Sequence, residues 1–187
     1  MAKTLDPSHL KEENSMAFSM YDASVQISAQ QLGALATIID KTAAHCEANK
    51  IEESALLTDR LYPDMFCLAR QIRQAADFGR NMPGRLAGIA GPEFAAVDAT
   101  SFAEAKKRVE DSLAFVSTLT RAQIDGTEDK DIVWSGGGKD RKMKGAAYLQ
   151  QFALPNFYFF VTTTYNILRH RGVPIGKLDF LGPISMG

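Results

Sequence analysis

The sequence ALPNFYFFVTTTYNILRH, residues 153–170, decides the fold predicted for this chain of 187 residues. It predicts the last of four long helices, which starts near Gly145 and stops before Gly172. Pro155 lies inside this helix and cannot donate to the carbonyl of Gln151. We therefore expect that carbonyl to be free and the helix to bend there. The apolar run is too short and too interrupted to cross a membrane.

Two earlier helices are predicted from apolar residues that recur every three or four positions. The first runs from about residue 24 to residue 49. The second begins at Pro63 and Asp64, because proline is tolerated in a first helical turn and a carboxylate there favours the helix dipole. It fades between residues 79 and 88.

The third helix follows residues 88–101, a segment rich in glycine, proline and small residues that is typical of a loop. It opens at Ser101, which lies three residues before Glu104 as in a capping box. The sequence DIVWSGGGKDRKMKG, residues 131–145, predicts a hairpin whose basic residues pair with acidic residues across its turn. The predicted fold class is therefore all-α: an up-down four-helix bundle with a short β-hairpin between helices 3 and 4.

Length and composition predict one core-forming domain, with residues 1–19 as a flexible leader and residues 20–187 as a single helical-bundle domain. The formal net charge of -1 favours neither nucleic acid nor an anionic membrane as a partner. The first 20 residues contain no apolar run typical of a secretory signal, and Cys46 and Cys67 form no regular disulfide framework. We therefore expect free thiols and a cytoplasmic protein.

The residues with metal-binding or nucleophilic side chains match no motif of a known site. Neither His45 nor His170 has the glutamate three residues earlier that a di-iron bundle requires. His45, Cys46 and Cys67 form a local cluster of soft ligands, but adjacent residues point about 100° apart on a helix, so we expect a structural role. The glycines at 136–138 lack the spacing of a phosphate-binding loop. We therefore predict no metal ligand and no cofactor, and the sequence identifies no catalytic residue.

Asn156 follows Pro155 directly and places an amide in an apolar wall. A buried amide and the free carbonyl of Gln151 both need hydrogen-bond partners. Either Arg70 or Gln71 of the second helix supplies them, or a water or a ligand does. The sequence leaves both alternatives open, a structural polar patch and a pocket.

Four stretches together resemble an uncharacterised family. They are MYDASV at 20–25, LYPDMFCLARQI at 61–72, FALPNFYFF at 152–160 and ILRHRGVPIGKLDFLG at 167–182. The family is domain of unknown function nineteen ninety-three, in the DinB/YfiT-like superfamily. The resemblance covers roughly residues 19–182 and implies a four-helix bundle that is commonly a homodimer.

The resemblance also implies where a site would lie. Members of the superfamily are often metal-dependent, with three histidines at one end of the bundle, and some are thiol transferases or hydrolases. The matching positions here are near Gln71 and at Asn156 and Phe160, and none is histidine. Members of the closer family often keep histidine at the position of Phe160. Phenylalanine has no lone pair to give to a metal, so this chain departs from both patterns.

Three functions follow as alternatives. The first is a metal-free bundle that binds a small molecule or acts as an accessory protein. The second is a metal-dependent transferase or hydrolase with a non-histidine ligand set, whose oxygen donors suit Mg²⁺, Ca²⁺ or Mn²⁺. The third is a structural homodimer joined through the aromatic face of the last helix. The predicted ligand-binding residues are Asp64, Arg70, Gln71, Asn156, Phe160 and Tyr165.

Overall fold

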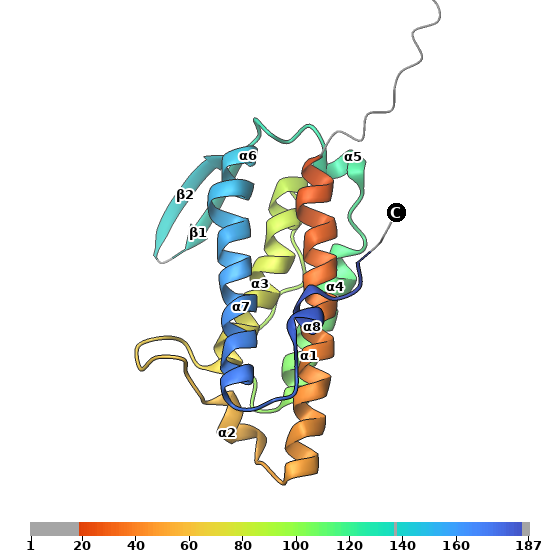
Figure 1. The fold of residues 1–187 in the computed structure, drawn as a ribbon. Coiled ribbons are helices and arrows are strands. Elements are labelled where there is room, and N and C mark those ends of the chain that lie inside the picture. The colour runs from red at the N-terminus through yellow and green to blue at the C-terminus, as the bar shows by residue number, and fades with distance from the viewer. Residues whose placement is uncertain (1–18, 137, 185–187) are drawn as a thin grey trace, which may run out of the picture.

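Four long helices form the body of the computed structural model, which describes residues 19–136 and 138–184 (Figure 1). They confirm the predicted all-α bundle with a hairpin before its last long helix. The leader lies outside the described residues except for Ser19, so the division into leader and bundle domain stays a prediction. The long helices are α1 (Ile27–Asn49), α3 (Leu68–Ala87), α4 (Phe102–Val116) and α7 (Leu154–His170). The shorter elements are η2 (Asp22–Gln26), α2 (Glu53–Leu57), α5 (Arg121–Ile124), β1 (Asp131–Gly136), β2 (Lys139–Lys144), α6 (Gly145–Ala147), η3 (Tyr148–Ala153) and α8 (Lys177–Leu181).

The long helices surround one apolar core, and the short helix α8 helps to close it. Helix α4 packs against α1 and α3, and α3 packs against α7. Helix α8 lies against α1, in front of the gap between α1 and α7 (Figure 1). The rings of Tyr165 on α7 and Phe180 on α8 are 5.8 Å apart, and Lys41 on α1 forms an ion pair with Asp179. Within residues 19–136 and 138–184, no helix has the length and apolarity of a membrane span.

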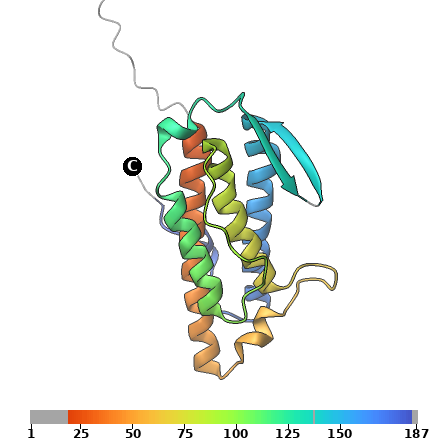
Figure 2. The same cartoon turned by 180° about the vertical axis from the view of Figure 1, so that it is seen from behind.

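Helices α3 and α4 run in the same direction because the segment 89–101 returns along the bundle (Figure 2). Both begin beside α2: the amide of Leu68 donates to the carbonyl of Asp59, and the amide of Phe102 donates to Glu53. The 20 residues of α3 span roughly 30 Å. The returning segment can reach roughly 40 Å when extended, so it is long enough to cross the bundle.

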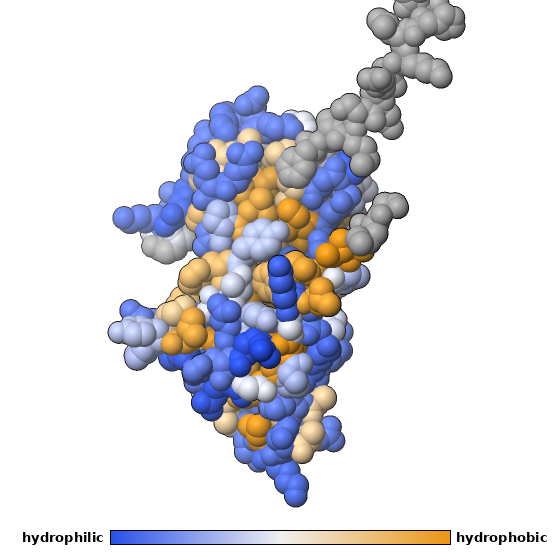
Figure 3. Space-filling view, in the orientation of Figure 1, coloured by the Kyte–Doolittle hydropathy of each residue, from blue (hydrophilic) through white to orange (hydrophobic). Residues whose placement is uncertain are grey.

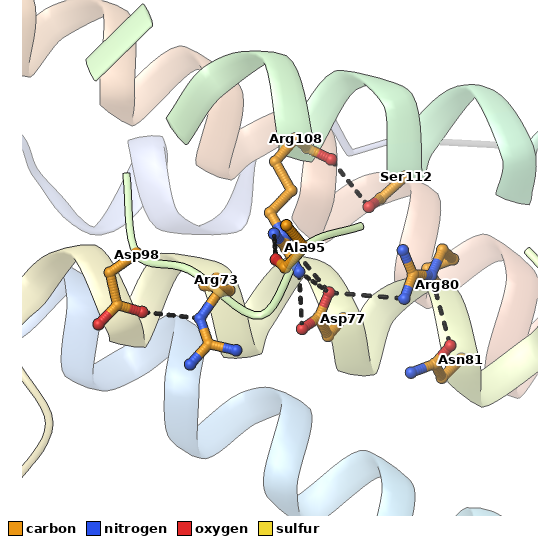
Figure 4. A network of polar contacts seen from close by, with 8 residues as sticks. All are labelled: Arg73, Asp77, Arg80, Asn81, Ala95, Asp98, Arg108 and Ser112. Carbon is orange, nitrogen blue, oxygen red and sulfur yellow. Dashed lines mark hydrogen bonds and ion pairs between the residues drawn. The ribbon is translucent and has the colours of Figure 1, made fainter. Parts of the chain in front are cut away.

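A network of ion pairs holds the segment 89–101, which we call the crossing segment, against α3 and α4 (Figure 4). Arg73 on α3 donates to Asp98 in the segment at 2.7 Å. Arg108 on α4 donates to the carbonyl of Ala95 at 2.9 Å and to both oxygens of Asp77 on α3. Arg80 completes the network with a 3.5 Å ion pair to Asp77. A short loop would have made α3 and α4 an antiparallel pair. Here the two helices are parallel, and the ion pairs hold the long connection between them in place.

The predicted start of the second long helix at Pro63 and Asp64 is wrong. Helix α3 begins at Leu68, after an extended Cys67, and the two earlier residues lie in a turn. The side chain of Arg60 donates to the carbonyl of Met65 and closes this turn. Proline and aspartate are also favoured in turns, so their local chemistry did not distinguish the two structures.

The predicted start of the third long helix is confirmed. Ser101 is the N-cap of α4, and its hydroxyl accepts a hydrogen bond from the amide of Glu104 at 3.2 Å. The carboxylate of Glu104 accepts in return from the amide of Thr100 at 2.8 Å. Exchanged bonds of this kind satisfy donors that the first helical turn leaves free.

The irregularity predicted at Pro155 takes the form of a π-helical turn. The chain is helical from Gly145 to His170, and η3 occupies residues 148–153 directly before α7. A wide turn of this kind is a common interruption of a helix next to a proline. The side-chain Nδ2 of Asn156 donates to the backbone carbonyl of Phe152 at 2.7 Å, so the partner of this side chain lies one turn earlier in the same continuous helical segment.

The predicted hairpin forms, and its two faces differ. Trp134 points inward, and its ring lies 5.2 Å from the ring of Tyr148 in η3. On the outward face Asp131 forms ion pairs with Lys142 at 2.8 Å and Lys144 at 2.9 Å. The predicted pairing of charges across the turn is therefore confirmed for Asp131.

Candidate functional site

Three of the six predicted site residues, Asp64, Gln71 and Phe160, meet at one pocket. It lies where the loop between α2 and α3 faces α7, and its cavity volume is about 230 Å³. Figure 3 shows hydrophobic surface at this junction. We call it the aromatic pocket, and its lining residues are Asp64, Met65, Phe66, Gln71, Phe159 and Phe160.

Phenylalanine rings form most of the pocket wall. Phe160 is only 8% exposed, and its ring stacks on Phe66 with centroids 6.4 Å apart and planes 4° apart. Phe78 supports Phe160 from behind at 5.4 Å. Phe159 meets Phe160 edge to face at 5.5 Å and is 54% exposed. The wall therefore consists of a buried ring, Phe160, and a half-exposed ring, Phe159.

The amide of Gln71 is the polar feature of the pocket. Gln71 is 1% exposed, and its Nε2 donates to the carbonyl of Phe66 at 3.1 Å. Its Oε1 is buried and accepts no hydrogen bond from any residue that the structure describes. A buried acceptor without a donor costs about 1–3 kcal/mol. A residue that lines the pocket thus carries one buried hydrogen-bond acceptor without a donor among the described residues.

The other three predicted residues lie away from the cavity. Arg70 is exposed, and its guanidinium carbon lies 3.9 Å from the ring centroid of Phe66. Asn156 uses its amide within its own helix, and Tyr165 contacts α8. The structure therefore brings half of the predicted residues together.

Sequence reasoning missed Met65, Phe66 and Phe159. Met65 and Phe66 belong to the loop that was assigned to a helix, so their positions could not be derived from helical periodicity. Phe159 precedes Phe160 and is exposed, and its edge-to-face contact depends on the rotation of α7 after η3. The signal that could have found them is the stretch LYPDMFCLARQI itself, because it places Met65 and Phe66 within six residues of Gln71.

The donor atoms at the pocket do not fit the metal site of the superfamily. The side chains that line it offer oxygen only from the Gln71 amide and the exposed Asp64 carboxylate, and Phe160 offers no donor. Throughout the described part of the chain, no three histidine, cysteine, aspartate or glutamate side chains gather closely enough to hold a metal ion. Cys46 and Cys67 are free thiols, and burial raises the pKa of the Cys46 thiol, which favours its neutral form.

Comparisons with known proteins agree with this architecture. A family model described as domain of unknown function, DUF1993, matches residues 20–181. A crystal structure of a DinB family member protein from Shewanella denitrificans is 32% identical and has a TM-score of 0.77. The similarity covers 89% of this chain and 94% of that chain. No curated protein matches the chain. The chain therefore belongs to the DUF1993 family, within the DinB-like superfamily.

Proposed function

We propose that this protein binds a small, mostly apolar molecule in the aromatic pocket, without a metal ion. The observation that carries the proposal is the buried Oε1 of Gln71, which lacks a donor among the described residues and belongs to a residue that lines the cavity. An N–H or O–H group of a ligand would supply the missing donor. A ligand with one N–H or O–H donor should therefore bind more tightly than a purely apolar ligand of the same shape.

The pocket walls define the rest of the ligand. The exposed half of Phe159 and the stacked pair Phe66 and Phe160 offer ring surface, and aromatic ligands pack on such surface in offset or edge-to-face arrangements. Asp64 lies at the pocket with an exposed carboxylate. A carboxylate and an amide oxygen both disfavour an anion. The preferred ligand is therefore a neutral or cationic aromatic molecule with an N–H or O–H donor.

The test compares two probes that differ by one donor, indole and 1-methylindole. Amide chemical shifts measured by NMR should move for residues 64–71 and 159–160 on titration with indole. Without its N–H, 1-methylindole should bind about two- to twelvefold more weakly, since one hydrogen bond contributes about 0.5–1.5 kcal/mol.

Gln71→Met removes the acceptor while keeping the shape of the side chain, and should abolish the preference for indole. Gln26→Met, at an exposed position that lines neither the aromatic pocket nor the groove beside the hairpin, serves as the matched control. Equal affinities of the two probes for the unmodified protein, or a preference that survives Gln71→Met, would contradict the proposal.

The structural homodimer is a second candidate, favoured by exposed aromatic side chains beside the pocket. Tyr158 is 38% exposed and Phe159 is 54% exposed, both on α7. If this face joins two copies, Phe159→Asp should give a monomer by light scattering while Val97→Asp, at another exposed position, leaves the dimer intact. A dimer that survives Phe159→Asp would place the interface elsewhere.

The metal-dependent alternative is tested separately. Elemental analysis of the purified protein, together with thermal shift against Mg²⁺, Ca²⁺ and Mn²⁺, should show neither stoichiometric metal nor stabilisation. A stabilisation that Asp64→Asn removes would support the enzyme instead. We also infer a cytoplasmic location, which the free thiols of Cys46 and Cys67 support.

A further inference from the structure

A second groove lies further along α3, between that helix and the β-hairpin, and shares no lining residue with the aromatic pocket. Its cavity volume is about 340 Å³. Helix α3 contributes side chains three or four positions apart, which places them on one face. We call it the hairpin groove, and α3 lines it with Gln74, Asp77, Phe78, Asn81 and Arg85.

The hairpin contributes a cation to the groove from its inward face. Arg141 is the cross-strand partner of Trp134, so the two side chains lie on the same face of the hairpin. Arg141 forms no ion pair with any residue in the described ranges, whereas its neighbour Lys142, on the outward face, is paired with Asp131. An exposed guanidinium therefore lines the groove without a carboxylate partner.

Arg85 contributes a second guanidinium from the opposite wall. Its Nη1 donates to the hydroxyl of Tyr148 at 3.3 Å, and its Cζ lies 5.7 Å from the Trp134 ring. Burial raises the pKa of Tyr148, which keeps this partner a neutral phenol. The charge of Arg85 is thus held in place but not neutralised, and other N–H groups of its guanidinium remain for a ligand.

The carboxylate that lines the groove does not neutralise the two arginines that line it, so the groove has an excess of positive charge. Asp77 is the carboxylate of the groove wall, and it already accepts from Arg108 at 2.9 Å and pairs with Arg80 at 3.5 Å (Figure 4). Burial lowers the pKa of Arg80, Asp77 opposes this shift, and the nearby charges of Arg108 and Arg85 add to it. Asp77 is shared between two guanidinium groups, so it does not compensate Arg85 or Arg141.

Three aromatic rings form the floor between these cations. The ring of Phe152 lies 4.8 Å from Trp134 and 5.8 Å from Phe78. Phe78 and Phe152 are partly exposed, so ring surface is accessible. We propose that the hairpin groove binds a small aromatic anion, whose ring packs on Phe78 and Phe152 and whose carboxylate or phosphate is bound by Arg85 and Arg141. Guanidinium groups are suited to both anions because their N–H donors match two oxygens at once.

Trp134 gives a direct measurement, because it is the only tryptophan of the chain. Its emission, excited at a wavelength that the probes do not absorb, should change saturably on titration with phenyl phosphate. Benzoate tests the carboxylate as the anion, inorganic phosphate lacks the ring, and benzyl alcohol lacks the charge. We expect at least one of the two aromatic anions to bind tenfold more tightly than inorganic phosphate and benzyl alcohol.

Arg141→Gln should weaken that binding about tenfold, since a hydrogen bond to a charged group contributes about 1.5 kcal/mol or more. Lys142→Gln removes the same charge from the outward face of the same strand and should change affinity less than twofold. Because Arg141 is exposed, both variants should fold, which circular dichroism checks. Equal weakening by the two variants would show a general charge effect and overturn the proposal. Absence of saturation, or equal binding of inorganic phosphate, would overturn it as well.

The hairpin groove is independent of the proposed function. Gln71→Met should leave the phenyl phosphate titration unchanged, and Arg141→Gln should leave the preference for indole unchanged. A failure of one site therefore does not count against the other. A Gln71→Met variant that loses phenyl phosphate binding would contradict the separation of the two sites.

Discussion

Gln71 and Asp77 lie less than two turns apart on α3, yet their polar groups have opposite surroundings. Every carboxylate oxygen of Asp77 accepts from Arg108, and Arg80 adds a further ion pair. The Oε1 of Gln71 accepts nothing from the described residues. Asp77 lines the hairpin groove, but its oxygens are occupied by the bonds that connect α3 with α4, whereas the Oε1 of Gln71, a residue of the aromatic pocket, is left without a donor. On one helix, the bonded carboxylate of Asp77 thus helps to hold the fold, whereas the amide oxygen of Gln71 lacks a donor beside a cavity.

The largest expected effect comes from breaking the saturated side of this comparison. Asp77→Ala leaves the guanidiniums of Arg80 and Arg108, which are 10% and 15% exposed, without their shared carboxylate. We expect a loss of about 3 kcal/mol in the free energy of unfolding, measured by urea denaturation. Asp111→Ala removes an i,i+4 partner of Lys107 in an exposed pair and should cost less than about 0.5 kcal/mol. Similar losses in the two variants would refute a structural role for the network.

The next effect comes from Gly79, which lies on the packed face of α3 between the two regions. A Cβ there would lie 2.9 Å from Cε2 of Phe157 on α7 and 3.0 Å from Cδ2 of Leu32 on α1. We expect Gly79→Ala to cost about 1–2 kcal/mol despite the higher helix propensity of alanine. It should also weaken indole binding, because a displaced α7 moves Phe159 and Phe160.

Gly33→Ala on α1 is the matched control, since a Cβ there meets nothing within 4 Å. It should stabilise the protein by about 0.5–1 kcal/mol through helix propensity alone. A gain in stability for both alanine variants would show that the contacts between α1, α3 and α7 relax without strain.

A smaller effect is expected on the unsaturated side. Gln71→Met loses the hydrogen bond to the carbonyl of Phe66 but also removes a buried oxygen that lacks a donor. The two changes oppose each other, so the free energy of unfolding should change by less than about 1 kcal/mol. A loss above about 2 kcal/mol would mean that Gln71 is structural, and the contrast with Asp77 would disappear.

The smallest effect concerns a peripheral ion pair that belongs to neither region. The hydrogen bond from Lys41, followed by the amide of Gly176, holds the pKa of Asp179 below its usual 3.8. A carboxyl whose pKa is lowered by folding stabilises the protein above its unfolded pKa, and this contribution is lost as pH falls through the folded pKa. The melting temperature should therefore decrease as the pH is lowered below about 4.

Asp179→Asn should remove part of this acid dependence and leave the melting temperature at neutral pH slightly lower, as expected for a solvent-screened pair. Differential scanning calorimetry at pH 3 to 7 measures both. An acid limb of unchanged slope in the variant would assign the dependence to other carboxylates, such as Asp22, whose pKa the hydrogen bond from Arg121 lowers.

The sequence predicts those parts of the fold that depend on local chemistry. Helical periodicity and the capping pair Ser101 and Glu104 predicted α4, and alternating residues predicted the hairpin with its Asp131 pairs. The start of α3 was missed because Leu68 is fixed by a tertiary bond to Asp59. The parallel course of α3 and α4 was missed because it depends on pairs such as Asp77 with Arg108, which are 31 residues apart.

The same distinction applies to the candidate site. Gln71 and Phe160 were found through the family pattern, which marks positions even where the residue types differ. Phe66 was missed because its contact with Phe160 joins residues far apart in the chain, across a loop. The hairpin groove was equally hidden, since the inward orientation of Arg141 follows from the strand register and not from the basic run itself.

The π-helical turn η3 determines how the residues before it are rotated about the helix axis relative to those of α7. Because such a turn holds one residue more than an α-helical turn, deleting one residue from 148–153 would rotate the part before it by about 100° relative to α7. A deletion between Tyr148 and Phe152 would then separate the ring of Tyr148 from that of Phe152, while Phe160 kept its orientation. Insertions and deletions at this position can therefore reshape the hairpin groove, which both Trp134 and Phe152 line, in evolution while the aromatic pocket is inherited unchanged.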